Sequence, residues 1–241
     1  MKFRSLIIIS TVLICCCFTT QKSSVIQIDI SYLLNARPVT TLTNGKLVSW
    51  TKGIDGNGDG DGYLTHSAAE FNGDKDAHAL PDNPVFAANV QHPQIELHYN
   101  NADSVHSQAR FVSGNGEFLI RTPKAHYSAI YLGISSSEGS SSMQFDLIYT
   151  DKTETKNYML PDYYNNVSEK YPDLSYVATD LAKWGKKHKM TEKDHHNIHL
   201  LKLNIDPDRK LTAIKISKSK QPYLKLQVVV IAMSQKYPGR I

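Results

Sequence analysis

The segment of residues 55–62 contains the most specific arrangement of metal-binding side chains in the sequence. Oxygen-bearing residues stand at every second position, and every residue between them is glycine. Glycine adopts positive φ angles without a steric clash, so this backbone could wrap and direct four side chains toward one point. Calcium prefers six to eight oxygen ligands in a flexible cage, whereas magnesium requires stricter octahedral geometry. The sequence therefore predicts a structural calcium site, with a solvated acidic turn as the alternative. The predicted ligands are Asp55, Asn57, Asp59 and Asp61.

The same segment does not match an EF-hand, although its spacing is similar. Asp55, Asn57, Asp59 and Gly60 stand at positions 1, 3, 5 and 6 of such a loop, but position 12 is His66, where a bidentate glutamate is needed. No flanking pair of helices is predicted either. A bound ion would therefore hold a connection in place and would not act as a switch.

Three histidines lie close together within residues 194–199. On a helix, His195 and His199 would share one face, as two zinc ligands do in H-E-x-x-H, but the required glutamate is missing. Residues 197–205 are typical of a strand, so we interpret the histidines as its polar beginning, with a zinc site as the alternative. The sequence contains no Gly-x-Ser-x-Gly motif for a nucleophilic serine.

The N-terminus is typical of an export signal. Residues 1–4 are basic, an apolar segment follows at residues 6–17, and polar residues come next. The apolar segment is too short for a membrane span. We therefore expect residues 1–20 to be a signal peptide or lipoprotein signal and residues 21–241 to form one mature domain.

All three cysteines of the sequence, Cys15, Cys16 and Cys17, lie at the end of this apolar segment. Their position resembles that of a lipid-attachment cysteine, with Cys16 or Cys17 as the anchor, so we expect the protein to be secreted or displayed as an outer-membrane or cell-surface lipoprotein. The mature chain then contains no disulfide and no cysteine nucleophile.

The composition excludes several classes of protein. Hydrophobic residues make up 41% of the 241 residues, which is enough to bury a core. Without Lys2 and Arg4 the chain has 25 basic and 23 acidic residues, a balance too even for a nucleic-acid-binding protein. We expect a monomer with no membrane span.

Short apolar or alternating runs, separated by turn residues, predict many strands. Residues 35–93 are rich in loops, with short apolar pieces at residues 46–50 and 85–88, and one short helix is predicted at residues 180–190. Because long crossover helices are absent, we expect an all-β fold, a single antiparallel sandwich with a loop-rich N-terminal third. The predicted strands are residues 25–30, 94–99, 108–112, 117–121, 128–134, 143–149, 199–205, 211–216 and 224–232.

Several segments match a known family in their order. They are Asp29 with Asn35, and residues 71–74, 79–81, 127–133, 145–151, 161–164, 200–206, 211–214 and 228–232. Together they resemble the galactose-binding-like β-sandwich, or jelly-roll, modules attached to many bacterial glycoside hydrolases. The resemblance covers residues 25–234. The chain departs from the family in the long acidic segment at residues 55–62, in Tyr163 where tryptophan is usual, and in the lack of an attached catalytic domain.

This resemblance implies non-catalytic binding of a polysaccharide or other glycan through loops at one end of the sandwich, with a structural calcium nearby. Planar polar side chains bind sugar hydroxyls, and an aromatic face covers the C–H surface of the ring. For each aromatic side chain, packing in the core is the alternative. The candidate ligand-binding residues are Trp50, Tyr63, His66, Asp74, Asp76, His78, Tyr163 and Tyr164.

Two other classes of function remain open. A jelly-roll polysaccharide lyase would need a base and a cation in one groove, and the candidates are Arg110, Arg121, His126 and Tyr127. A glycosidase cannot be recognised from sequence, because its two carboxylates are defined by their distance in space. The third class is a surface lipoprotein that binds another protein. The basic residues within 183–189 predict a solvated helix face or a contact for an anionic polymer.

Overall fold

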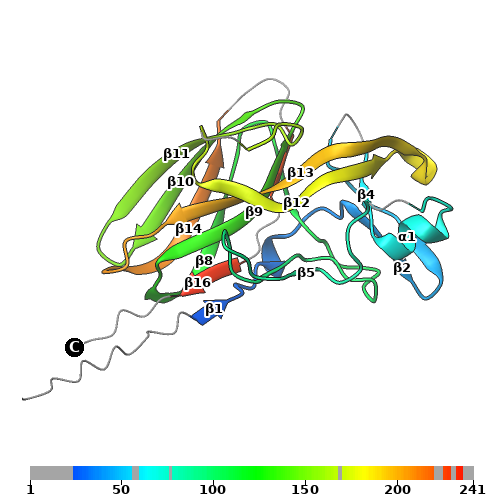
Figure 1. Cartoon of the computed structure of the whole chain (residues 1–241). Helices are drawn as coiled ribbons and strands as arrows, with labels where there is room; N and C mark the ends of the chain where they lie inside the picture. Colours follow the sequence, from blue (N-terminus) through cyan, green and yellow to red (C-terminus); the bar gives the residue numbers. More distant parts are fainter. Residues whose placement is uncertain are drawn as a thin grey trace, which may run out of the picture.

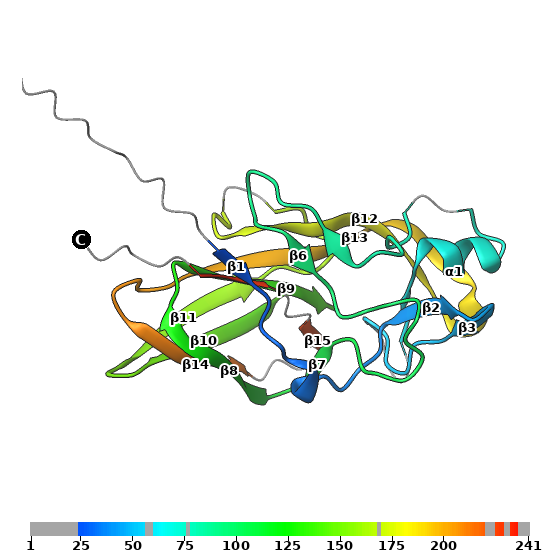
Figure 2. The ribbon, with the colours of Figure 1, turned by 90° about the horizontal axis from the view of Figure 1, so that it is seen from below.

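Two antiparallel sheets form a β-sandwich (Figures 1 and 2). The computed structural model describes residues 24–55, 60–75, 78–167, 170–219, 225–228 and 232–235. The first sheet has the order β11 (Thr153–Leu160), β10 (Ser141–Tyr149), β14 (Lys210–Lys218) and β8 (Gly116–His126). The second has the order β1 (Ser24–Ile26), β16 (Ala232–Gln235), β9 (Ala129–Ser137), β13 (Met190–Asn204) and β12 (Leu174–Trp184). In the same sheet, β15 (Lys225–Val228) pairs with both β9 and β7 (Arg110–Ser113). The prediction of an all-β sandwich is confirmed.

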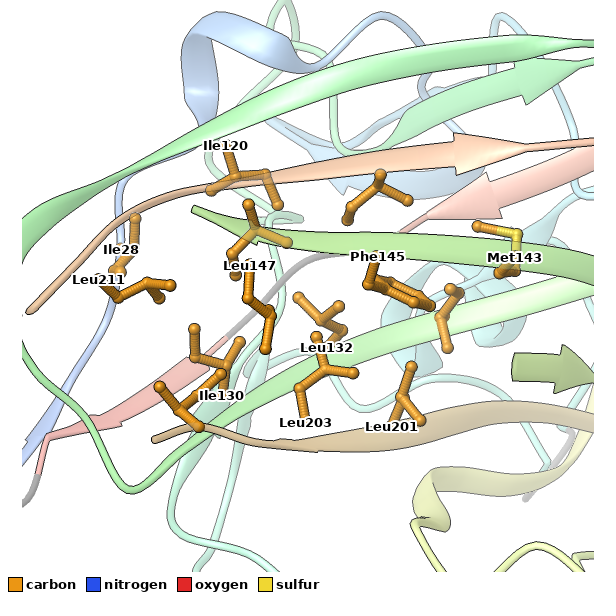
Figure 3. Close-up of a cluster of buried hydrophobic side chains, with 14 of the residues drawn as sticks. Ile28, Ile120, Ile130, Leu132, Met143, Phe145, Leu147, Leu201, Leu203 and Leu211 are labelled. Carbon is orange, nitrogen blue, oxygen red and sulfur yellow. The ribbon is translucent and has the colours of Figure 1, made fainter. Parts of the chain in front are cut away.

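The main core lies between these two sheets, as Figure 3 shows. Alternate residues of β10 point inward, so Met143, Phe145 and Leu147 are buried while Gln144 is exposed. Side chains from β8, β9, β13 and β14 meet them from the other strands. Each fully buried aliphatic or aromatic side chain stabilises the fold by about 1.5–3 kcal/mol. The residues labelled in Figure 3 are Ile28, Ile120, Ile130, Leu132, Met143, Phe145, Leu147, Leu201, Leu203 and Leu211.

The second sheet is buried on both of its faces. Along β9, Ile130 and Leu132 face the sandwich core, whereas Tyr131 belongs to a second cluster on the opposite face. In β13, Leu201 faces the sandwich core and Leu200 joins the second cluster. The second cluster is completed by side chains from the N-terminal third of the chain.

That N-terminal third forms a loop-rich lobe against the second sheet, as predicted. Its strands are short: β2 (Val39–Thr43), β3 (Lys46–Val48), β4 (Tyr63–Leu64), β5 (Val85–Phe86) and β6 (Ile95–Glu96). It also contains a 3-10 turn, η1 (Ser31–Leu33), and the α-helix α1 (His66–Phe71). Tyr63, Ile95 and Leu97 of this lobe pack into the cluster that covers the second sheet.

Strands β12 and β13 continue beyond the sandwich as a two-stranded ribbon that lies against α1, β2 and β4 (Figure 1). The predicted helix at residues 180–190 is wrong, because this segment is the end of β12 and the turn η2 (Lys186–His188). Its apolar residues Leu181, Ala182 and Trp184 are buried by pairing with β13 and by the lobe. The register shifts at several points along the ribbon, and Asp180 and His195 have φ angles of 57° and 75°.

No described helix is both long and apolar enough to cross a membrane. The predicted signal at residues 1–20, together with Cys16 and Cys17, lies outside the described residues.

Candidate functional site

A buried lysine lies at the centre of an acidic cluster between the ribbon and the lobe. The register of the ribbon places Lys183 of β12 opposite Glu192 of β13. The Lys183 Nζ atom lies 2.5 Å from Asp55 Oδ2, 2.6 Å from Glu192 Oε1 and 3.8 Å from Asp61 Oδ2. Only 9% of the Lys183 side chain is exposed. One ammonium group therefore pairs with three carboxylates that come from two separate parts of the sequence.

Asp55 is held entirely by donors from the protein. Its Oδ2 atom also accepts a hydrogen bond of 2.8 Å from the Tyr163 hydroxyl, and its Oδ1 atom accepts one of 3.0 Å from the Asp61 amide. Burial raises the pKa of Asp55, but Lys183, the Asp61 amide and the Tyr163 hydroxyl together outweigh it, so this pKa lies below its usual value. Asp55 is therefore ionised at neutral pH and acts as one half of a buried ion pair.

Lys183 pairs with two of the carboxylates that we predicted as calcium ligands, those of Asp55 and Asp61. Asp55 is occupied as described, and Asp61 Oδ2 accepts a hydrogen bond of 2.8 Å from Thr191 Oγ1. The other two predicted ligands, Asn57 and Asp59, lie outside the described residues. As arranged, the two described ligands do not fit a calcium ion, because an ion bound to Asp55 would have to displace Lys183. Calcium at the rest of this segment stays a prediction.

Three rings contact one another beside the acidic cluster, and two of them are stacked. The rings of Tyr163 and His196 are parallel within 23° at a centroid distance of 4.8 Å, and the Tyr164 ring lies 4.6 Å from His196. Tyr163 and His196 are buried, whereas Tyr164 is 41% exposed. On the other side of His196, the Glu192 Oε2 atom lies 3.7 Å from His196 Nε2, and the Glu192 side chain is 39% exposed. We call Tyr164, Glu192 and His196 the Tyr164 surface.

His196 presents an acceptor that has no donor. Its Nδ1 atom lies 2.7 Å from the Leu181 carbonyl oxygen, and because a carbonyl only accepts, Nδ1 carries the proton. Burial lowers the pKa of His196, so the ring is neutral at pH 7 and Nε2 carries a lone pair. Nε2 is buried, and no described residue forms a hydrogen bond with it. Its neighbour Glu192 cannot donate while ionised, so Nε2 lacks a donor.

The two carboxyl groups near His196 both titrate above their usual range. Burial, reinforced by the charges of Asp55 and Asp61, raises the pKa of Glu192. Burial also raises the pKa of Asp162. Asp162 holds the turn that presents Tyr164, because its carboxylate accepts hydrogen bonds from the backbone amides of Tyr164 and Gly139.

Three of the eight predicted sugar-binding residues lie near one another around this site. Tyr163 and Tyr164 are two of the three rings in contact, and the charge of Asp55 acts on both Tyr63 and Tyr163. Tyr63 and Tyr163 are only 3% exposed, so packing in the core, the alternative for aromatic residues, describes them. Tyr164 alone offers an exposed ring.

The other predicted residues are dispersed. Trp50 packs edge-on against His188 at a centroid distance of 5.5 Å. His66 is the exposed first residue of α1, and Asp76 lies outside the described residues. The carboxylate of Asp74 accepts a hydrogen bond of 2.9 Å from the indole of Trp184, and His78 contacts Asp180, so each serves another part of the structure.

The four residues suggested for a lyase do not form one groove. Tyr127 is fully buried, and its hydroxyl donates to the Pro123 carbonyl at 2.6 Å. His126 lies at an open polar hollow of about 500 Å³ and contacts the Pro207 carbonyl through Nδ1 at 2.8 Å. Arg110 belongs to β7, whereas His126 belongs to β8, and the Arg110 guanidinium group lies over the Phe118 ring.

An apolar cavity of about 190 Å³ opens elsewhere, between β10, β11 and residues 170–174. Core side chains such as Met143, Phe145 and Leu201 form its floor. None of the predicted sugar-binding residues lines it. Pockets for drug-sized ligands usually measure about 300–1,000 Å³, so this cavity is smaller than most of them.

Sequence reasoning missed Lys183 and Glu192 as members of one cluster, and it interpreted His196 only as a polar strand residue. The sequence carries no signal for this cluster, because Glu192, Lys193 and Asp194 are three consecutive charged residues that do not alternate with apolar ones. The helix predicted at residues 180–190 also left β13 without its partner strand.

No protein-family model matches the chain, and a search of curated proteins finds no relative.

Proposed function

We propose that the protein is an exported, non-catalytic carbohydrate-binding protein, and that a glycan binds at the Tyr164 surface. The proposal includes the jelly-roll resemblance and export, both of which rest on the sequence. Its main support is one observation: the exposed ring of Tyr164 and the partly exposed carboxylate of Glu192 both lie next to the buried His196 ring.

Carbohydrate matches this surface chemically better than an anion or an apolar ligand does. Sugar hydroxyls donate to the carboxylate of Glu192, the accessible acceptor of this surface. The apolar C–H face of the same ring then covers Tyr164. An anion would be repelled by Glu192, and an apolar ligand would cover the Glu192 carboxylate without donating to it.

Binding to a panel of soluble polysaccharides, followed by affinity electrophoresis and titration calorimetry, tests the proposal. For any glycan bound by the wild type, we expect Tyr164→Ala to weaken binding at least tenfold, which is about 1.4 kcal/mol. Tyr32→Ala is the matched control, because Tyr32 is also exposed but lies on η1. Equal weakening by both variants, or no binding to any glycan, would contradict the proposal.

An enzyme is the second candidate, favoured by the raised pKa of Glu192 beside His196. A carboxyl group with a raised pKa can act as a general acid. The same panel is therefore assayed for new reducing ends and for unsaturated uronates. If the wild type cleaves a glycan and Glu192→Gln does not, this surface is a catalytic site, and the proposal of non-catalytic binding is wrong.

A further inference from the structure

We propose that a zinc-class divalent metal ion binds to Asp180, Asp194 and His195 at the outer side of the ribbon, independently of the proposed glycan site. One ligand atom from each residue lies within 4.8 Å of the other two. Asp180 belongs to β12, and Asp194 and His195 belong to β13. All three side chains are partly exposed, so an ion can reach them from solvent.

The local backbone brings these groups together. The ladder between β12 and β13 shifts register between the pairs Ala178–Ile198 and Leu181–His196, which places an irregular segment in each strand. Within it, the His195 amide donates to Asp180 Oδ1 at 3.1 Å. The Asp180 amide in turn donates to Asn197 Oδ1 at 3.2 Å. These bonds hold the three side chains at the same point of the ribbon.

The charges of this cluster differ from those of the buried cluster around Lys183. Among the residues that the structure describes, neither Asp180 nor Asp194 forms an ion pair with a lysine or an arginine. Their nearest ionisable neighbours are imidazoles. His195 Nδ1 contacts Asp194 Oδ1, and His78 Nδ1 lies 3.1 Å from Asp180 Oδ2. Two carboxylates with adjacent imidazoles can act as ligands for a metal cation. No described lysine or arginine occupies that place.

The identity of the ligand atoms selects the class of ion. Calcium binds oxygen ligands, whereas zinc accepts both imidazole nitrogen and carboxylate oxygen at about 2.0–2.2 Å. Neighbouring ligands of a tetrahedral zinc ion lie about 3.3–3.6 Å apart, given those bond lengths. The three ligand atoms lie within 4.8 Å of one another, so rotation of these exposed side chains can bring them to such separations.

His78 is placed to orient the site and to connect it to the lobe. Its Nδ1 atom donates to the Asp180 carbonyl at 2.6 Å, which fixes the ring next to the Asp180 carboxylate. The His78 carbonyl also accepts a hydrogen bond of 3.1 Å from the Ala182 amide. A bound ion would therefore strengthen the junction between β12, β13 and the loop that follows α1.

Titration calorimetry with zinc chloride tests the site, using purified protein without a histidine tag. We expect one zinc ion per chain and at least tenfold weaker binding by both His195→Asn and Asp180→Asn. Asparagine tolerates positive φ angles, so both variants keep the local backbone conformation. Melting curves confirm that each variant is folded.

The matched control is His106→Asn. His106 Nδ1 lies 3.0 Å from Asp103 Oδ1, so this residue forms an exposed histidine–aspartate pair without a second carboxylate. We expect the zinc affinity of this variant to stay within twofold of the wild-type affinity. X-ray absorption spectra at the zinc edge should show nitrogen and oxygen ligands in the wild type. Absence of zinc binding, unchanged affinity in His195→Asn, or equal loss in His106→Asn would overturn the proposal.

Discussion

Replacement of Lys183 by methionine removes the only lysine or arginine that pairs with the buried acidic cluster among the described residues. Methionine preserves most of the apolar length of the side chain but leaves the Asp55 carboxylate, which is 6% exposed, without its counter-ion. Breaking a buried ion pair by removing one partner costs about 3–5 kcal/mol. For a chain of this size, each kcal/mol lowers the melting temperature by about 2–4 °C, so a fall of about 6–20 °C is expected.

The loss should depend on pH in a defined direction. In the wild type the pKa of Asp55 lies below its usual value, so its stabilising effect is present above the unfolded-state pKa of about 3.9 and is lost as the pH falls further. Without Lys183, burial is the main remaining influence and raises this pKa, so protonation relieves the buried charge. The difference in stability between wild type and Lys183→Met should therefore be smaller at pH 4 than at pH 7.

Urea unfolding at both pH values measures these differences. Lys186→Met is the matched control, because Lys186 is exposed in the adjacent turn, and we expect it to change stability by less than about 0.5 kcal/mol. In Asp55→Asn/Lys183→Met the cost should be smaller than the sum of the single costs, since the buried charge is gone. A cost below about 1 kcal/mol for Lys183→Met at pH 7, or a larger cost at pH 4, would refute the reasoning.

Other predictions concern packing and calcium. In Gly62→Ala the new Cβ atom would lie 2.7 Å from the Trp50 indole, so unfolding assays should show a loss of about 1–3 kcal/mol, and no loss would contradict this packing. Trp184→Phe removes the indole donor to Asp74 and should destabilise the protein by at least about 1–3 kcal/mol, with a smaller loss when Asp74→Asn is already present. If calcium binds the acidic segment, chelation by EGTA should lower the melting temperature of the wild type but not of Asp59→Ala. We expect this fall in melting temperature to be small, because Lys183 already pairs with Asp55 and Asp61 at the two described ends of the segment. An unchanged melting temperature would rule calcium out.

Strands with strong patterns were predictable from sequence. The predicted residues 117–121, 143–149 and 211–216 lie within strands of the sandwich, and 128–134 and 199–205 do so except for Ser128 and Ile205. Their inward side chains are large and apolar, so the alternation is clear. By contrast, β11 was missed because it is an edge strand with a polar sequence, and its charged residues Glu154 and Lys156 protect an otherwise open sheet edge.

The candidate site was harder to predict because it depends on pairing. Asp55, Tyr163 and Tyr164 were selected individually for their chemistry, but Lys183 and Glu192 become partners only through the register of β12 and β13. Propensity favoured a helix at residues 180–190, and the burial of Trp184 between ribbon and lobe favoured a strand. Tertiary contacts of this kind have no local signature in the sequence.

The double burial of the second sheet has a consequence for the order of folding. Residues 36–109, which form the lobe, are synthesised before β9 and β13, the strands they cover. Apolar side chains of the lobe, such as Ile95 and Leu97, therefore lack the β13 part of their cluster until about a hundred further residues have been synthesised. Contacts over such separations form slowly and leave the nascent chain prone to aggregation. Folding of this protein should accordingly depend on chaperone protection until β13 is complete.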